Sequence, residues 1–552
     1  MRSWLKRYIG EIQLRLPQKR ATDPLFYACA FMIVASLGLG GATTSGFLSD
    51  TILAFLAIPL LACGIWRLFD IEISRQMRGA LWFCLALVAI PLLQLVPLPG
   101  WLWTLLPHRQ ISAESFALMR QSMPWMPISV SPEATWLSAL SLLPPLALFV
   151  GIVLLGYRDR RWLSLVVIAV GVISAFLGVL QVAQGPSSSL RFFQLTNPFE
   201  AVGFFANRNH FAALVNVLVV LTAAWAVQTG TEAGSALKHR EFDTVPTIAA
   251  LGCFVILVLL LVAQAMARSR AGIALTMVAL LAAFSLAIAD RRGATEESST
   301  TSRLFFGAIA VAILLVVQLA LYRILERFEV DPFEDERFTY VLNTLKAALA
   351  YLPVGSGVGT FVPVYQLFEP PQDFHANAHL NRAHNEFVEA WLETGIFGVV
   401  LMGWFVAWFG RRALEIWRNV AHPADAIDRS LARSATVIIP LIVAHAFFDY
   451  PLRTSAMMAI VAFACALLIN PPASALLRQP ILAPQTRRAR LSAAKPVPAL
   501  AISPLPSAVT NSPQALPAPT RGERWGTDMQ WPDEWRSLSD SPDAQTGPRK
   551  RP

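Results

Sequence analysis

Apolar runs long enough to cross a lipid bilayer recur along most of this chain of 552 residues. A helix needs about 20 mainly apolar residues to span the hydrocarbon core of a membrane. Because the runs are long and alternate only weakly, they indicate helices rather than the strands of a barrel. The sequence therefore predicts an all-α integral membrane protein with about 12 transmembrane helices. The expected spans lie near residues 26–46, 51–67, 80–97, 136–156, 162–183, 209–228, 247–267, 271–289, 304–322, 388–410, 435–450 and 455–471.

Composition agrees with this class of protein. Hydrophobic residues make up 55% of the chain and charged residues 15%. The formal net charge is +9, but the basic residues are scattered between the apolar runs, so they predict membrane orientation and argue against binding of nucleic acid. All five cysteines fall inside apolar runs without a Cys-x-x-Cys pair, so neither a disulfide framework nor a thiolate metal site is expected.

The two ends of the chain differ from its apolar middle. Residues 1–24 carry several basic side chains, so we expect a segment that lies against the anionic cytoplasmic leaflet. No cleavage pattern of small residues follows, so the first apolar run is expected to be a retained span. Residues 25–471 then form the polytopic membrane domain, and an even number of spans places both termini in the cytoplasm. Residues 472–552, rich in Pro, Ala, Ser and Arg, are expected to form a disordered tail.

Several arginines depart from the positive-inside pattern that this orientation otherwise gives. Those in the loops expected outside are Arg191, Arg208, Arg268, Arg270 and Arg382. A planar guanidinium group can form two parallel hydrogen bonds to phosphate oxygens, so arginines that converge on an outer cavity would suit a diphosphate. The alternative is that they reach the lipid headgroups.

Two outer loops are long. The loop from about Pro99 to Thr135 is rich in Trp and Pro and predicts an interfacial belt, with a short helix lying on the membrane. The largest loop, about residues 323–387, separates spans nine and ten. Within it, the apolar spacing over Arg337 to Tyr351 predicts an amphipathic helix, and the glycines of Gly355 to Gly359 predict a flexible turn that leads to His384.

At His384, a polar loop runs into an apolar helix that still carries carboxylates. Glu386, Glu389 and Glu393 share one helix face. Carboxylates at membrane depth are costly, so they indicate a functional site by default. A neutral imidazole beside them could take a proton from a sugar hydroxyl. The alternative is that His384 and Asn385 only cap the helix while the glutamates reach the interface.

Other candidate constellations are less specific. His375 and His379 share the loop of His384, but the residues between them and the lack of a His-Glu-x-x-His pattern argue against a metal site. After the eleventh span, Asp449 is expected either to form a structural ion pair with Arg453 or to orient a ligand.

Taken in order, these motifs resemble the O-antigen ligase family of bacterial membrane glycosyltransferases, which also includes many O-antigen polymerases and protein O-oligosaccharyltransferases. The family signature is His, then Asn, Ser or Gln, then nine residues, Gly, two residues and Gly. His384 with Asn385, Gly395 and Gly398 fits it, although Val399 stands where Thr is common. Also similar are the segments 203–212, 269–272, 337–361 and 445–452.

The resemblance implies a helical membrane fold of the glycosyltransferase C type. It implies a glycan on undecaprenyl diphosphate as donor and a hydroxyl of a glycan, lipid or protein as acceptor, at the periplasmic face of the bacterial inner membrane. No cofactor, nucleotide sugar or, in the ligases, metal is implied. The essential His corresponds to His384. The diphosphate arginine would be Arg270, and a second one expected near the sixth span would be either Arg208 or Arg191. Apart from the resemblance, Arg382 is a further candidate for the diphosphate because it lies in an outer loop, and we expect Asn385, Glu389, Arg337, Asn209 and Asp449 to support the site.

Three functions stay open from the sequence. The expected one is an O-antigen ligase-like glycosyltransferase in surface polysaccharide or lipopolysaccharide biosynthesis, and a polymerase of the same family is the nearest alternative. A transporter of polysaccharide or lipid-linked glycan would need ionisable residues along its spans, whereas the middle of spans such as residues 247–263 carries none. A sensor that signals through the tail has only the aromatic patch at residues 525–535 in its favour.

Overall fold

The computed structural model describes residues 23–43, 48–194, 196–238, 244–291, 336–373, 380–418 and 426–471. Eight helices within these residues are long and apolar enough to cross a membrane, by length and composition. The expectation of an all-α membrane protein is therefore confirmed. The total of about twelve spans stays a prediction, because the expected span at residues 304–322 lies outside the described residues. The terminal segments 1–22 and 472–552 also lie outside them.

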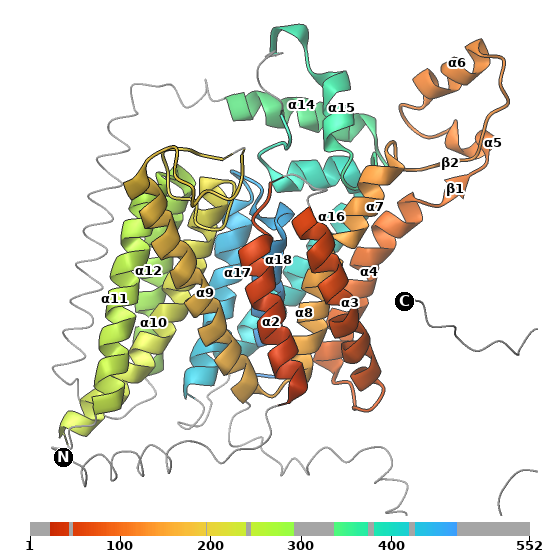
Figure 1. Ribbon diagram of the computed structural model, residues 1–552. Helices are drawn as coiled ribbons and strands as arrows, with labels where there is room; N and C mark the ends of the chain where they lie inside the picture. Colours follow the sequence, from red (N-terminus) through yellow and green to blue (C-terminus); the bar gives the residue numbers. More distant parts are fainter. Residues whose placement is uncertain are drawn as a thin grey trace, which may run out of the picture. The chain divides into compact units, whose positions relative to one another are not determined.

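Figure 1 shows the described elements in chain order. They are α2 (Pro24–Leu39), α3 (Leu48–Leu68), α4 (Arg75–Gln94), β1 (Pro97–Leu98), α5 (Gly100–Trp103), α6 (Gln110–Leu118), β2 (Met126–Pro127), α7 (Pro132–Leu140), α8 (Leu143–Leu154), α9 (Tyr157–Gln184), α10 (Arg208–Lys238), α11 (Thr244–Ala267), α12 (Arg270–Arg291), α14 (Glu336–Ala350), α15 (Phe361–Phe368), η2 (Pro371–Asp373), α16 (Glu386–Arg418), α17 (Ala426–His445), η4 (Pro451–Arg453) and α18 (Ser455–Leu467).

Short polar side chains set where several of these helices begin. Oδ1 of Asp23 accepts a hydrogen bond of 2.9 Å from the amide of Leu25 at the start of α2. Oγ of Ser74 accepts one of 3.2 Å from Met77 in α4, and Thr454 caps α18 in the same way. Each cap provides an acceptor for an amide that has no partner inside its own helix.

Two helices differ from the spans expected from hydropathy. The run at residues 136–156 is divided between α7 and α8, because Pro144 and Pro145 follow the break and a proline cannot continue the hydrogen-bond ladder of a preceding turn. Helix α17 begins at Ala426, well before residue 435, and ends at His445. Hydropathy does not predict its first turns, because they contain polar residues such as Arg433. This side chain is buried against the ring of Trp417.

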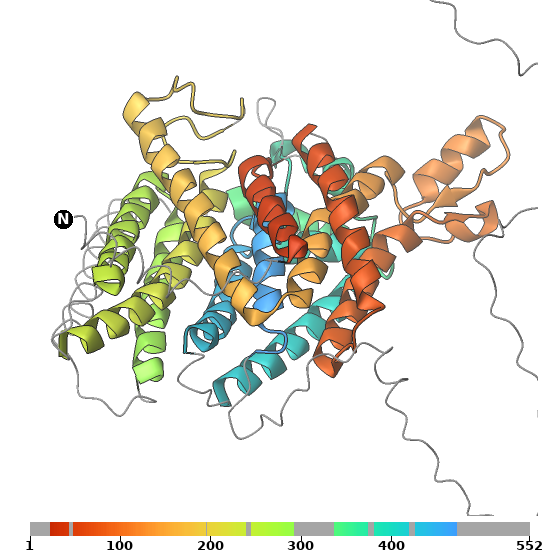
Figure 2. The same cartoon turned by 60° about the horizontal axis from the view of Figure 1, so that its bottom comes forward.

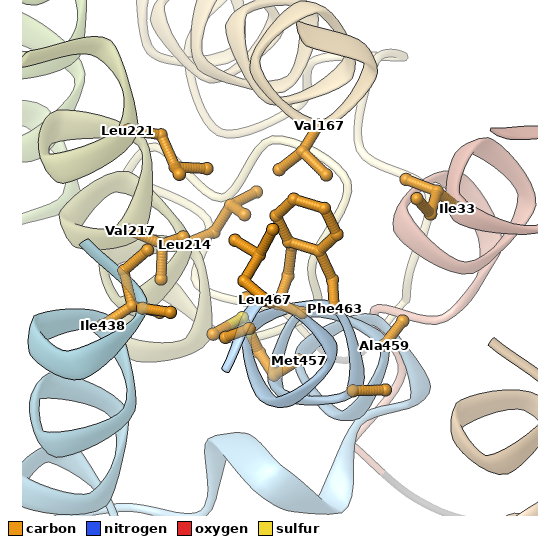
Figure 3. Packing of buried hydrophobic residues seen from close by; sticks show 14 of the residues in the cluster. Ile33, Val167, Leu214, Val217, Leu221, Ile438, Met457, Ala459, Phe463 and Leu467 are labelled. Carbon is orange, nitrogen blue, oxygen red and sulfur yellow. The ribbon is translucent and has the colours of Figure 1, made fainter. Parts of the chain in front are cut away.

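The centre of the bundle lies around α10, α17 and α18. Helix α10 is buried along almost its whole length and packs against α9, α11, α12 and α17. Figure 2 shows α17 and α18 between the α2–α3 pair and the α9–α12 group. Figure 3 shows apolar side chains of neighbouring helices in this core, among them Val167, Leu214, Ile438 and Phe463. In a membrane, this close packing rather than transfer out of water holds helices together.

A second, smaller group of apolar side chains covers one end of the bundle, the upper end in Figure 1. Helices α14 and α15 contribute Tyr351, Phe361 and Tyr365, which pack with Leu392 of α16. Helix α14 confirms the amphipathic helix expected at residues 337–351. The antiparallel pair β1–β2 begins an arm with exposed Trp101, in the loop expected to be rich in interfacial aromatic residues.

Candidate functional site

Helix α16 is broken at Gly395, and a distant glycine-rich turn fills the break. Gly395 has φ 60° and ψ −144°, so the helical ladder is interrupted there. The carbonyl of Leu392 accepts the amide of Ser356 at 2.9 Å, and the carbonyl of Glu393 accepts the amide of Gly357 at 3.0 Å. The amide of Ile396 in turn donates to the carbonyl of Pro353, at 2.9 Å. The two segments therefore satisfy each other's backbone groups.

Gln94, at the end of α4, closes the same junction from a third direction. Its side chain is 4% exposed. Nε2 donates to the carbonyl of Glu393 at 2.8 Å, and Oε1 accepts the amide of Val358 at 2.9 Å. One amide side chain thus ties α4, the glycine-rich turn and α16 together.

The glycines of this junction are required by close approach of two backbones. Gly355 has φ 78°, and a Cβ there would lie 2.6 Å from the carbonyl oxygen of Glu393 and the amide nitrogen of Gly395. A Cβ on Gly398 would overlap Oγ1 of Thr394. The expectation of a flexible turn at residues 355–359 is therefore wrong, because this turn is bound to the helix that follows His384.

Asn385 caps the N-terminus of α16. Its Oδ1 accepts hydrogen bonds of 3.1 Å from Phe387 and 3.2 Å from Val388, and its Nδ2 donates 3.3 Å to the carbonyl of Phe447. His384 precedes it with φ 55°, in the left-handed region that a non-glycine residue seldom adopts. Asn385 therefore provides the cap, and the ring of His384 faces another partner.

That partner is Asp449, a carboxylate that is 1% exposed in the turn between α17 and η4. Nδ1 of His384 lies 3.3 Å from its Oδ1. The same oxygen accepts the amide of Tyr450 at 3.0 Å and faces Nε2 of His210 at 3.8 Å. Nδ2 of Asn209 donates to the other oxygen, Oδ2. Burial alone would raise the pKa of Asp449, but the two neighbouring imidazoles bring that pKa well below its usual range.

Asp449 does not pair with Arg453, so the expected ion pair between them is wrong. Arg453 lies in a buried cluster with the acidic face of α16: its Nη2 is 2.8 Å from Glu393 and 3.2 Å from Glu389. Nη1 of Arg382 lies 2.9 Å from the same Glu389. The buried carboxylates raise the pKa of Arg453, although burial alone would lower it.

The glutamates of α16 do share one face, as the sequence predicts, but they do not reach the interface. Glu386, Glu389 and Glu393 are 7%, 0% and 1% exposed. Oε2 of Glu389 accepts the amide of Ala383 at 2.8 Å, next to His384. This face therefore anchors the loop that carries His384.

Three of the four candidate phosphate-binding arginines, Arg191, Arg208 and Arg270, come from two segments that touch, whereas Arg382 lies in the loop before α16. Nη1 of Arg191 donates to the carbonyls of Asn197 and Glu200, at 2.8 and 3.0 Å, while its Nε and Nη2 have no hydrogen-bond partner among the described residues. Arg208 pairs with Glu200 at 2.6 Å. Burial lowers the pKa of Arg191.

The second segment is the corner between α11 and α12, where Arg270 is the exposed first residue of α12. Oγ of Ser269 accepts the amide of Gly272 at 3.0 Å and so fixes this corner. The amide of Ala201 donates 3.1 Å to the carbonyl of Met266, which joins the loop of Arg191 and Arg208 to the corner.

Of the remaining predicted residues, the structure places Arg337 but not His375 or His379. Nη1 of Arg337 donates 3.0 Å to the carbonyl of Phe448, so this residue ties α14 to the Asp449 turn. His375 and His379 lie outside the described residues. Sequence reasoning gave no role to His210, Tyr450 or Gln94. His210 and Tyr450 had a signal, because they lie in the segments 203–212 and 445–452 that resemble family motifs.

The comparisons with known proteins address the same part of the chain. A family model described as O-antigen ligase matches residues 255–403, which include the Ser269–Arg270 corner, the glycine-rich turn and His384. No curated protein matches the chain significantly. This match to residues 255–403 supports the resemblance to the O-antigen ligase family that the sequence motifs indicate.

Proposed function

We propose that this protein is a membrane glycosyltransferase that moves a glycan from undecaprenyl diphosphate to an acceptor hydroxyl at the periplasmic face of the bacterial inner membrane. The observation that carries the proposal is the ring of His384, held at the mouth of a membrane helix with Nδ1 3.3 Å from buried Asp449. An imidazole paired with a carboxylate on one nitrogen presents the other nitrogen as a base.

His384 is the catalytic base in this reaction. With the proton on Nδ1 directed at Asp449, the lone pair of Nε2 accepts the proton of the acceptor hydroxyl. The acceptor oxygen forms a bond to the anomeric carbon of the glycan as the bond from that carbon to the diphosphate oxygen breaks. The electron pair of the broken bond stays on the diphosphate, and the configuration at the anomeric carbon inverts. His384 then releases its proton to water.

The arginines stabilise the leaving group. Negative charge grows on the diphosphate during bond cleavage, so fixed cations stabilise the transition state more than the ground state. Arg270, Arg208 and Arg191 suit this role because their two segments are joined by the Ala201–Met266 hydrogen bond. Arg382 is a further candidate: its Nη1 pairs with Glu389, but its buried Nε has no hydrogen-bond partner among the described residues.

The supporting residues act through backbone position. Asn385 caps α16, Glu389 binds the backbone beside His384, Arg337 holds the Asp449 turn and Asn209 holds the carboxylate. The finer fold is part of the proposal: about twelve helices of the glycosyltransferase C type, the loop at residues 323–387 in the periplasm, and both termini in the cytoplasm.

The buried arginines at the end of the bundle away from His384 do not favour a transporter. Buried Arg160 donates to backbone carbonyls at the ends of α8 and α18, including Ala466 and Ile469 at 2.7 Å. Arg412 donates to the carbonyl of Leu468 at 2.6 Å. These arginines complete helix ends instead of lining a path.

The test is transfer by the purified protein in lipid nanodiscs, with an undecaprenyl-diphosphate-linked glycan as donor. Separate reactions offer a lipid-linked glycan and a lipid or protein hydroxyl as acceptor, and so separate polymerase from ligase. We expect His384→Ala to lower transfer at least about a hundredfold. His108→Ala is the matched control, because that ring stacks on Tyr351 at 5.3 Å, away from Asp449. Undiminished transfer by the His384 variant would refute the assignment.

A further inference from the structure

We propose that His210 is a positioning residue that acts on His384 through Asp449. The inference rests on the proposed function, in which His384 is the base. His210 lies near the start of α10, in a part of the chain remote in sequence from both His384 and Asp449.

The first observation is that one carboxylate oxygen faces two imidazoles. Oδ1 of Asp449 is 3.3 Å from Nδ1 of His384 and 3.8 Å from Nε2 of His210. His210 is 0% exposed, and neither of its ring nitrogens has a closer hydrogen-bond partner among the described residues. A buried polar ring without a partner is costly, so the carboxylate is the group that His210 is placed to use.

The second observation is that adjacent residues of α10 hold both oxygens of the carboxylate. Asn209 donates to Oδ2, and His210 faces Oδ1. The ring of Tyr450 stands edge-on to both imidazoles, with centroids 4.8 Å from His210 and 5.2 Å from His384, and so keeps them apart. The start of α10 therefore sets where the carboxylate lies and how it meets His384.

The arrangement has an electrostatic consequence with a definite sign. An N–H of His210 directed at Oδ1 from 3.8 Å offsets part of the negative charge that His384 experiences, so the protonated form of His384 is stabilised less. Removing that donor should move the acid limb of the activity profile to higher pH. The other titratable groups near the carboxylate are Tyr450 beside it, His445 of α17, Arg337 of α14 and Glu386 of α16. All of them remain in the variants used as the primary test.

The primary experiment measures kcat against pH for the full-length protein in nanodiscs. His210→Leu removes the donor and keeps an apolar side chain of similar volume. We expect its acid limb to move up by about one pH unit, with plateau activity within about tenfold of wild type. His210→Gln restores an amide donor and should return the profile to that of wild type. A purely structural role predicts equal loss at every pH and no rescue specific to the amide.

His445→Leu is the matched control. His445 is also 0% exposed, has both ring nitrogens without a hydrogen-bond partner and has no ion pair among the described residues. This variant removes an equally buried imidazole near the site, so its acid limb should not move. An equal shift in the His445 and His210 variants would overturn the inference, since the effect would then come from any loss of a buried ring.

Two further measurements keep the test decisive. In an Asp449→Asn background, His210→Leu should leave the acid limb where it is, because the carboxylate through which His210 acts is gone; a shift as large as in the wild-type background would overturn the inference. The His210→Gln variant gives an arm that does not depend on folding of the leucine variant: a shifted acid limb with the amide donor in place would overturn the inference. Absence of transfer by wild type, or full transfer by His384→Ala, would refute the proposed function instead. Transfer that needs His384 but shows no shift on loss of His210 would refute this inference alone.

Discussion

Substitution of Arg453 by Met should be among the most destabilising single changes at the upper end. Arg453 contacts two carboxylates that are almost fully buried, Glu393 at 2.8 Å and Glu389 at 3.2 Å. Methionine keeps much of the length of the side chain but provides no positive charge. The substitution therefore leaves buried carboxylates in place and removes the cation between them.

The two carboxylates should not contribute equally. Glu389 keeps Arg382 at 2.9 Å and the amide of Ala383 at 2.8 Å. The other oxygen of Glu393, Oε1, has no hydrogen-bond partner among the described residues, so this side chain depends on Arg453. Removal of one partner of a buried ion pair costs about 3–5 kcal/mol, and we expect a loss of unfolding free energy in that range, mostly from Glu393.

The assay is equilibrium unfolding in mixed detergent micelles, followed by helix content. Arg67→Met is the matched control: Nη2 of Arg67 lies 2.7 Å from Asp23, but the two side chains are 35% and 34% exposed, so its loss should cost less than about 1 kcal/mol. The double variant Arg453→Met with Glu393→Gln should recover most of the loss, because the unpaired charge is then absent. A cost below about 1 kcal/mol for Arg453→Met, or no recovery in the double variant, would refute this account of the cluster.

Three other changes test separate parts of the structure by the same unfolding measurement. Gly355→Ala should cost more than about 2 kcal/mol, because alanine is strained at φ 78° and its Cβ meets the backbone of α16; an unchanged free energy would contradict the interlocked junction. Asn385→Ala should cost about 1 kcal/mol through loss of the α16 cap, whereas Asn385→Asp should retain most of it. Arg160→Met should cost about 3 kcal/mol or more, since it leaves several buried carbonyls without a donor, and a cost near zero would show that water or lipid replaces it.

Hydropathy predicts the long spans because each depends on its own residues. A run such as residues 247–267 is apolar throughout, and α11 forms there with nearly the expected bounds. The prediction fails where a helix contains buried polar residues, as at Arg433 in α17. The guanidinium of Arg433 is stabilised by its contact with the ring of Trp417, and a hydropathy window does not include such tertiary contacts. The break between α7 and α8 was foreseeable from Pro144 and Pro145, which lie inside an otherwise apolar run.

The partners within the candidate site depend on contacts that leave no periodic signal. His384 is recognisable from its motif. That Asp449 lies beside His384, and not beside Arg453, depends on where α17 ends. Likewise, the pairing of Arg453 with the glutamates requires η4 to lie beside the start of α16, which the amide of Leu452 secures by donating 2.6 Å to Glu386. A single sequence shows which residues are ionisable, but it does not show which imidazole or guanidinium groups contact the same carboxylate.

The junction at Gly395 explains why separate motifs in this chain belong together. A glycine that breaks a membrane helix exposes backbone groups that lipid cannot satisfy. The turn that contains Gly355 and Gly357 satisfies them, and this turn requires glycine for the same reason, since the two backbones meet without room for a Cβ. Each segment satisfies backbone groups of the other, so the junction at the break fixes the position of the part of α16 that follows His384. The weak individual motifs are therefore one structural unit, and its purpose is to hold an imidazole against a buried carboxylate at the end of a membrane helix.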